Sequence, residues 1–585
     1  MSALVDGTDE QRRRLRKTLM EMSMGRGYLI INLETQRDRN KHKRDDPTDK
    51  IFTSSSDVFG NLATELTERI LMKLSMRDAF KASTVSKNWI HAWNSTPKLV
   101  LDDKNFMRFD NYESMFIEFV ERVLSSREGP ILQFHLSTCI ENKMKINRWL
   151  FFSMRYNKIK ELHLEVCYAR KYKVPQLLFS CHELVHLKLV KCKLTPPQDF
   201  KGFNMLKNLH LEMVKITDSE LKNLLSSCTQ LEELAFIDLP WITEIDIRNT
   251  KVRQLNIVGS YERFQLENQS LINATLINIF YHDVHDLLTI FFCKNLVHLE
   301  ISGYKDLVLP SLRDMKLETV KLSLPTLPPD SITNLVSECH QLKKLDVMIH
   351  DTDYQEIQIV STSLQSLKIG RRYSHLHLAC PQLIDASIYI GTDLYFWDSV
   401  SHYCCFRKKQ RLSLKELEYR QTKVTLPVAF NHLEKLSLEV RFGNLMCEYI
   451  AFSFIQKAHR LHTLQIKCGI PEVHLGLSFG SDNFWEYLLK SGLEIRFKNL
   501  ITLTILHFNG SDEEISFLKF MVNAAPMLQE IKVIFLTQST MDFLTDPHLL
   551  YFFSNVEDLE SISCQRILAS IQKEGDRKLK VEFVY

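Results

Sequence analysis

Two short clusters of histidine and cysteine are the side chains best suited to chemistry. Cys181, His182, His186 and Cys192 form the first cluster, and His402-Tyr403-Cys404-Cys405 forms the second. Thiolate and imidazole groups are the usual ligands of zinc, but neither cluster carries the C-x-x-C pair typical of a structural zinc site. The phosphate-binding patterns G-x-x-x-x-G-K-[ST] and G-x-G-x-x-G are also missing from the sequence. We therefore predict no metal and no cofactor, and interpret the first cluster as part of a repeat and the second as a surface loop.

The elements that hold these residues follow a repeated pattern, apolar-x-x-apolar-x-apolar. The regular copies begin at Ile159, Leu184, Leu206, Leu231, Val252, Leu271, Leu296, Leu317, Leu342, Leu364 and Leu383. Their average spacing of about 22 residues lies within the range of leucine-rich repeats. More distant copies begin at Leu433, Leu461, Leu500 and Leu528, so insertions interrupt the last third.

The last two apolar positions of each copy lie two residues apart, on one face of a short strand. Strands stacked side by side form a parallel sheet, and the return segments cover its back. The sequence therefore predicts an α/β fold, a leucine-rich-repeat (LRR) solenoid. We expect the outward strand positions to contact a protein substrate, because they mix both charges with histidine and asparagine. The residues concerned are His163, Glu165, Lys188, His210, Asn256, His298, Glu300, Asp346 and Lys368.

Composition excludes several classes of protein. The chain has 585 residues, with 74 Lys and Arg against 71 Asp and Glu. This balance argues against a nucleic-acid partner, and no uncharged apolar run is long enough to span a membrane. Thirteen cysteines without a secretion signal indicate reduced thiols. We expect a protein of the nucleus, the cytoplasm or both.

A segment before the repeats has a helical period. Leu66, Ile70, Leu71 and Leu74 form one amphipathic stripe, and a later helix carries Trp89 with a second tryptophan four residues on. Three short helices in about 40 residues rarely bury enough apolar surface to be stable alone. The module must therefore pack against the repeats or against another protein.

Residues 57–103 resemble the F-box of plant F-box/LRR proteins. The resemblance rests on Val85-Ser-Lys-Asn-Trp-Ile-His-Ala-Trp93 and on Pro97-Lys-Leu-Val-Leu-Asp102, although Ala63 stands where the family usually has proline. Residues 500–585 resemble the FBD region of the same family. The expected organisation is a disordered basic and polar tail at 1–56, the F-box at 57–103, leucine-rich repeats at 104–400, irregular repeats with insertions at 401–499 and the FBD-like region at 500–585.

The resemblance implies a substrate-recognition subunit of an SCF-type ubiquitin ligase, a receptor without catalytic residues. Its F-box would bind a Skp-type adaptor and through it a cullin, while the LRR array would bind a protein substrate. The implied adaptor-binding residues are Leu62, Ala63, Glu65, Leu66, Ile70, Leu71, Leu74, Val85, Ser86 and Trp89.

Three alternatives remain open at this point. The helical module could simply cap the solenoid, which would leave a ligase-independent LRR scaffold. An enzyme could use an unrecognised site between about 390 and 432 or near the C-terminus. The array could also bind a small molecule or an inositol phosphate.

Overall fold

The structure is a computed structural model, and the chain in it forms two compact units. Unit 1 ends at Leu231 and includes Leu239–Trp241, and unit 2 contains Glu232–Asp238 and the chain from Ile242 onward. The structure describes residues 62–74, 76–83, 87–155, 158–167, 172–248, 250–278, 287–305, 307–328, 330–349, 355–370, 373–390, 424–426, 429–469, 483–491, 494–535, 565 and 579–584. The expected tail at 1–56 and the His402–Cys405 cluster lie outside these residues.

Unit 1 begins with three short helices and continues as a parallel sheet. The helices are α3 (Thr64–Lys73), α4 (Met76–Ser83) and α5 (Lys87–Ser95), which pack on one another as the α3–α5 module. The sheet follows in the order β1 (Lys98–Asp102), β2 (Gln133–Thr138), β3 (Glu161–Val166), β4 (His186–Val190) and β5 (Asn208–Glu212). The return segments contain η2 (Asp103–Asn105), α6 (Tyr112–Ser125), α7 (Lys143–Met154), η3 (Gln176–Ser180) and α8 (Asp218–Ser227).

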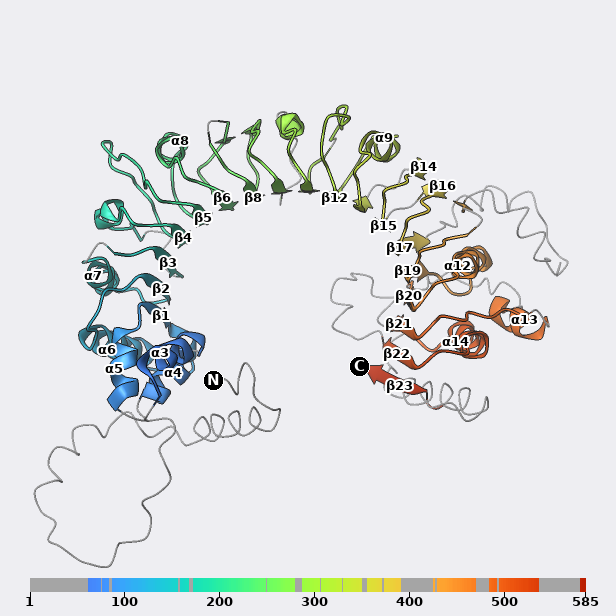
Figure 1. Ribbon diagram of the computed structural model, residues 1–585, viewed down its shortest axis with the longest axis horizontal. Helices are drawn as coiled ribbons and strands as arrows, with labels where there is room; N and C mark the ends of the chain where they lie inside the picture. The colour runs from blue at the N-terminus through green and yellow to red at the C-terminus, as the bar shows by residue number, and fades with distance from the viewer. Residues whose placement is uncertain are drawn as a thin grey trace, which may run out of the picture. The chain divides into compact units, whose positions relative to one another are not determined.

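Unit 2 also contains a parallel sheet. Its sheet contains β6 (Glu233–Ile237), β8 (Gln254–Val258), β10 (Asn273–Ile277), β11 (His298–Ser302), β12 (Thr319–Leu324), β13 (Lys344–Ile349), β15 (Ser366–Gly370), β17 (Asp385–Ile390), β19 (Lys435–Val440), β20 (Thr463–Cys468), β21 (Thr502–Phe508), β22 (Glu530–Phe535) and β23 (Lys580–Val584). Its helices are η4 (Leu287–Phe292), α9 (Ser331–Glu338), α12 (Leu445–Lys457), α13 (Phe484–Lys490) and α14 (Asp512–Ala524). Two small side sheets pair β7 (Glu244–Asp246) with β9 (Arg263–Gln265), and β14 (Gln355–Val360) with β16 (Tyr373–Ala379) and β18 (Val424–Thr425). In each unit the helices lie on one side of the row of strands (Figure 1).

The register of the sheets confirms the predicted solenoid. Leu187 on β4 pairs with Leu209 on β5, and Leu345 on β13 pairs with Leu367 on β15, so equivalent repeat positions stack. These leucines are at most 1% exposed, whereas the residues between them are exposed or half-buried. The apolar positions therefore build the core, and the intervening positions form one polar face on each sheet.

The array begins earlier than the regular copies of the pattern indicate. β1 and β2 are full members of the ladder, with Leu99 paired to Phe134. The second of these repeats has phenylalanine in place of the middle leucine, at Ile131-x-x-Phe134-x-Leu136. Later in the chain, Asp385 pairs directly with Lys435. The insertion between β17 and β19 therefore leaves the sheet register intact.

Candidate functional site

The α3–α5 module buries part of the predicted adaptor-binding stripe and leaves part of it accessible. Leu71 and Trp89 are only 3% and 4% exposed and belong to the module's own core. Leu62, Leu66, Ile70 and Leu74 are half-buried, whereas Ala63 and Glu65 are exposed. Val85 and Ser86 lie outside the described residues. The accessible part of the stripe is therefore the row of half-buried leucine and isoleucine side chains on α3.

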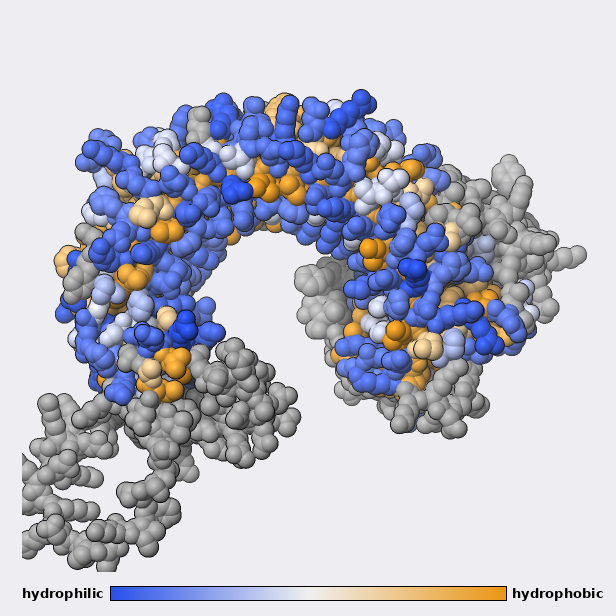
Figure 2. Space-filling view, viewed as in Figure 1, coloured by the Kyte–Doolittle hydropathy of each residue, from blue (hydrophilic) through white to orange (hydrophobic). Residues whose placement is uncertain are grey.

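Two further apolar side chains extend the accessible surface of the module. Met72 on α3 is 40% exposed and Ile90 on α5 is 44% exposed. Ile90 follows the core residue Trp89 and so points away from the buried face of its helix. Sequence analysis missed both, although the position of Ile90 between two tryptophans spaced i, i+4 could have indicated an outward side chain. Figure 2 shows hydrophobic surface gathered over this module.

The entry of α3 has the geometry that a proline would impose. Ala63 has φ −57° and ψ 139°, and its carbonyl accepts hydrogen bonds from the backbone N–H groups of Leu66 and Thr67. Proline fixes φ near −65°. Alanine at this position therefore keeps the helix start that the family's proline would hold.

A buried arginine connects the α3–α5 module to the first repeats through hydrogen bonds. Arg127, which follows α6, donates hydrogen bonds to the carbonyls of Trp93 and Lys98, the second at 3.2 Å. Burial lowers the pKa of Arg127 to about 10, so the guanidinium remains charged at neutral pH. Outside this contact, His91 Nδ1 lies 2.9 Å from a carboxylate oxygen of Glu128. The orientation of α5 therefore depends on side chains of the array.

The sheet of unit 1 brings three predicted substrate-binding residues into one row. His163, Lys188 and His210 occupy paired positions on β3, β4 and β5, and His135 on β2 continues the row. We call these four residues the central row of unit 1. Acidic side chains flank it: Glu161 lies 2.6 Å from His135, Glu212 lies 3.2 Å from His210, and Glu165 accepts a hydrogen bond from Ser137.

His163 is the least satisfied group of this row. Its Nε2 atom is buried and has no hydrogen-bond partner among the described residues. Burial, together with the positive charge of Lys188 and the neighbouring His135, lowers the pKa of His163 to about 4. The imidazole is therefore neutral at pH 7, and its buried Nε2 is left unpaired among the described residues.

The sheet of unit 2 places other predicted residues in a row whose charges pair with one another. Glu300, Lys321, Asp346 and Lys368 occupy consecutive paired positions on β11, β12, β13 and β15, and form the central row of unit 2. Lys321 lies 2.6 Å from Glu300, and Lys368 lies 3.6 Å from Asp346. His298 is exposed at the start of β11, and Asn256 sits in the equivalent row on β8 with a buried Oδ1 that has no partner among the described residues.

The cysteine and histidine cluster of the first repeats holds no assembled metal site. Cys181 and Cys192 are buried thiols, and burial raises the pKa of Cys181 to about 11. His182–His186 also has the zinc-protease spacing H-E-x-x-H, which binds zinc when both histidines share a helix face. Here a turn at 182–183 precedes β4, and Glu183 pairs with Lys158. Within the described part of the chain, no group of three or more His, Cys, Asp or Glu side chains could hold a metal.

A serine-hydrolase spacing, G-x-S-x-G, occurs at Gly476–Gly480. This pattern positions a nucleophile when a strand ends directly before it and a helix begins directly after it. The segment lies outside the described residues. Among the described helices, none is long and apolar enough to cross a membrane.

Comparison with known families matches a domain to the α3–α5 module and another to the repeats. An F-box domain model matches residues 59–101, which include the α3–α5 module. A leucine-rich-repeat domain model, described as the LRR domain of At1g61320/AtMIF1, matches residues 129–361. The chain therefore contains an F-box domain followed by leucine-rich repeats.

Relatives of this chain come from Arabidopsis thaliana. F-box/FBD/LRR-repeat protein At1g13570 is 33% identical over 26% of this chain and 36% of its own length. F-box protein At3g60790 is 30% identical over 16% of this chain and 20% of its own length. Putative F-box/FBD/LRR-repeat protein At1g66290 is 26% identical over 24% of this chain and 31% of its own length. The matches therefore span between a fifth and little more than a third of these relatives' own lengths.

A solved internalin from Listeria monocytogenes aligns with 60% of this chain and 87% of its own chain, at 13% identity and a TM-score of 0.30. The parallel ladder of this protein, rather than that likeness, defines its fold.

Proposed function

We propose that this protein is the substrate-recognition subunit of an SCF-type E3 ubiquitin ligase. The observation that carries the proposal is the coincidence of the F-box match with an exposed apolar surface on the α3–α5 module. Half-buried Leu66 and Ile70 and exposed Met72 and Ile90 offer a helix-packing surface for a Skp-type adaptor. The adaptor would connect the chain to a cullin.

The substrate surface in this proposal is the polar face of the LRR sheets. The central row of unit 1 supplies a neutral imidazole at His163 next to the ammonium group of Lys188, with flanking carboxylates at Glu161 and Glu165. Such a mixture of donors, acceptors and both charges suits a protein segment better than a nucleic-acid backbone. Lys188 is its most available group, because His135 and His210 already contact Glu161 and Glu212 and the Nε2 atom of His163 is buried.

The receptor would have no catalytic residue of its own. It would hold the substrate near a ubiquitin-loaded enzyme and so raise the effective concentration of the reacting groups. We include the region from about residue 500 in this proposal as the FBD named in the relatives, and its described strands β21, β22 and β23 extend the sheet of unit 2. We place the activity in the nucleus or cytoplasm, which imaging of the tagged chain would test.

A pull-down with a purified Skp-type adaptor tests the proposal. We expect wild-type protein to retain the adaptor and the double variant Leu66→Asp/Ile70→Asp to lose it, because two carboxylates would be desolvated against the adaptor's apolar surface. Met205→Asp/Met527→Asp is a matched control, since these methionines are exposed on the array, outside the module.

If folded wild-type protein does not bind the adaptor, or if both double variants bind like wild type, the ligase proposal is wrong. The protein would then be a free-standing LRR scaffold whose α3–α5 module caps the array. If adaptor binding holds, proteins that accumulate in cells expressing Leu66→Asp/Ile70→Asp become the candidate substrates.

A further inference from the structure

The outer side of α7 in unit 1 carries a groove that the proposed function does not use. The groove has a volume of about 340 Å³, at the small end for binding sites, and α7 forms one wall of it. Pro175 and Leu177 form the other wall. Its lining from α7 includes Met144, which is 77% exposed, and Phe151, which is 64% exposed.

The exposed apolar residues of α7 share one side of the helix with a basic one. Met144, Arg148 and Phe151 follow one another at i, i+4 and i+7, which places them on the same side of the helix. The opposite side is buried through Ile146 and Trp149. α7 therefore combines a face that packs in the repeat core with a second apolar face that no described part of the chain covers.

The distribution of charge along α7 is opposite to the one that stabilises a helix. Its first turn contains Lys143 and Lys145 and no acidic residue, although the amino end of a helix favours negative charge. Arg148 follows, and the helix sequence from Lys143 to Met154 contains no Asp or Glu. A carboxylate from the neighbouring helix, Glu121, contacts both Lys145 and Arg148. A feature that opposes local stability is often retained for binding.

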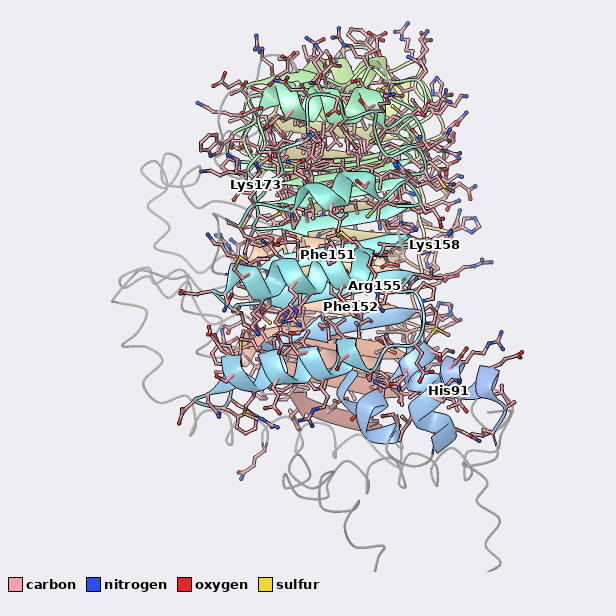
Figure 3. The ribbon with its side chains drawn as sticks, turned by 90° about the vertical axis from the view of Figure 1, so that its left-hand side faces the viewer. His91, Phe151, Phe152, Arg155, Lys158 and Lys173 are labelled. Carbon is pink, nitrogen blue, oxygen red and sulfur yellow. The ribbon has the colours of Figure 1, made fainter. Side chains whose placement is uncertain are left out.

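A row of lysines continues the positive charge past the groove. Lys173, Lys193 and Lys215 face one another through isolated parallel bridges, one lysine from each successive repeat. Their chain neighbours Val174 and Leu194 are buried, so the lysine side chains point outward. Lys215 lies over the ring of Trp241, but Lys173 and Lys193 are exposed and form no ion pair with any described carboxylate. Figure 3 shows Phe151 on the outer surface of α7, with Arg155 and Lys158 to one side and Lys173 to the other.

From this geometry we propose that the α7 groove and the lysine row bind an acidic segment of a partner protein. An apolar side chain of that segment inserts between Met144 and Phe151, and flanking Asp or Glu residues contact Arg148, Lys173 and Lys193. The groove is a hollow between α7 and the segment containing Pro175 and Leu177, so it accepts an inserted side chain, and the exposed side chains of Met144 and Phe151 line it. This docking site is separate from the α3–α5 module and from the polar sheet face, and it does not depend on adaptor binding.

Panning a phage-displayed library of random peptides on the immobilised full-length chain tests this proposal. We expect the selected peptides to carry an aromatic or aliphatic residue flanked by Asp and Glu. Fluorescence anisotropy of a labelled selected peptide should show at least about a tenfold loss of affinity for Met144→Ser/Phe151→Ser. Lys173→Glu/Lys193→Glu should weaken binding and reduce its salt dependence.

Matched control variants distinguish binding at this site from nonspecific binding. Phe292→Ser removes an equally exposed phenylalanine from η4, and Lys222→Glu/Lys251→Glu makes the same charge change elsewhere on the array. Both should bind the peptide like wild type, and thermal melts should show that all variants fold.

Several results would overturn the proposal. Selection of peptides without acidic residues would overturn it. Equal losses of peptide affinity in Met144→Ser/Phe151→Ser and in Phe292→Ser would also overturn it. Binding to anionic phosphatidylserine vesicles in place of peptides would make the groove a membrane contact. A dimer in sedimentation velocity that Met144→Ser/Phe151→Ser dissociates would make it a self-association surface.

Discussion

Unit 1 and unit 2 each contain a parallel sheet of repeats, but the polar side chains of their central rows are paired differently. In unit 2 the central row alternates in charge, and Lys321 and Lys368 pair with the carboxylates beside them. In unit 1 the central row places His163 next to Lys188, and a buried ring nitrogen of His163 has no partner among the described residues. The central row of unit 2 therefore pairs its own charges, whereas in the central row of unit 1 Lys188 forms no ion pair with any described carboxylate.

The starts of two helices, one in each unit, differ in how deeply their capping carboxylates are buried. Both α8 in unit 1 and α14 in unit 2 begin with a capping box, formed by Thr217 with Glu220 and by Ser511 with Glu514. Glu220 is half-buried and bonds to the backbone of Thr217. Glu514 is 1% exposed and accepts hydrogen bonds from the backbone N–H groups of residues 509, 510 and 511. The same motif is a surface feature in one unit and a buried polar centre in the other.

Removing each capping carboxylate in turn should give the largest difference in stability between the two units. We expect Glu514→Ala to lower the free energy of unfolding by about 3 kcal/mol, because it leaves several buried N–H groups without a partner. Glu220→Ala should cost less than about 1 kcal/mol, since water can replace its carboxylate. Urea denaturation of both variants measures the difference. Equal costs would show that burial of the cap at α14 contributes nothing.

The two units should also respond to pH in opposite directions. Burial raises the pKa of Glu514 to about 7 and that of Glu448 to about 8, from 4.5. Their folded forms hold protons that the unfolded chain has lost, so unit 2 should lose stability as the pH rises from about 4.5 to about 8. Burial lowers the pKa of His163 from 6.5 to about 4, so its contribution to unit 1 is present above pH 6.5 and is lost as the pH falls toward 4.

Limited proteolysis with mass-spectrometric mapping across this pH range can assign opening to each unit. Glu448→Gln/Glu514→Gln should remove the alkaline weakening of unit 2, and His163→Gln should remove the acid weakening of unit 1. If both units open together at every pH, or if the variants leave the profiles unchanged, these groups do not control the difference.

A smaller effect is expected at the start of α3, which has no side-chain cap. Ala63→Pro should raise the free energy of unfolding by about 0.5 kcal/mol, because the folded φ already suits proline and the unfolded chain loses freedom. Thermal denaturation compares the variant with wild type. A lower melting temperature would show that the backbone around Ala63 differs from the geometry described above.

The smallest contrast concerns the lysines of the two central rows. Lys321→Met should cost about 0.5 kcal/mol or less, because its ion pair with Glu300 is partly exposed and screened by salt. Lys188→Met should cost nothing measurable and should bring the pKa of His163 closer to its ordinary value, since the Lys188 charge lowers it. Urea midpoints at low and high salt measure both variants. A larger cost at Lys188 than at Lys321 would contradict the assignment of the unit 1 row to ligand binding.

Much of the fold was predictable because the core repeats itself in the sequence. Leucine spaced two apart within each copy fixes which strand face is buried, and the near-constant spacing fixes the order of strands. The first two strands lie outside the regular copies, although Ile131-x-x-Phe134-x-Leu136 fits the apolar pattern, and the segment containing β1 also carries the F-box resemblance. The buried role of Glu514 could not be predicted, because its burial depends on α12, α13 and α14 packing together through their aromatic side chains.

The surface proposed to bind an adaptor was predictable only in outline. Helical periodicity identifies an apolar stripe, but in a module this small both the core and the partner surface are apolar. Leu71 and Trp89 turned out to be core residues, and Met72 and Ile90 turned out to be exposed. The periodicity of one helix cannot distinguish these roles, because the packing of α3 against α5 decides them.

Calorimetric titration of a Skp-type adaptor into wild-type protein, Leu66→Asp/Ile70→Asp and His163→Gln/Lys188→Glu tests whether the α3–α5 module binds an adaptor while the polar sheet face serves a different ligand. We expect binding to wild type and to the sheet-face variant with the same affinity, and loss of binding only in the module variant. Failure of folded wild-type protein to bind, or weakening by the sheet-face variant equal to that by the module variant, would contradict this division of roles.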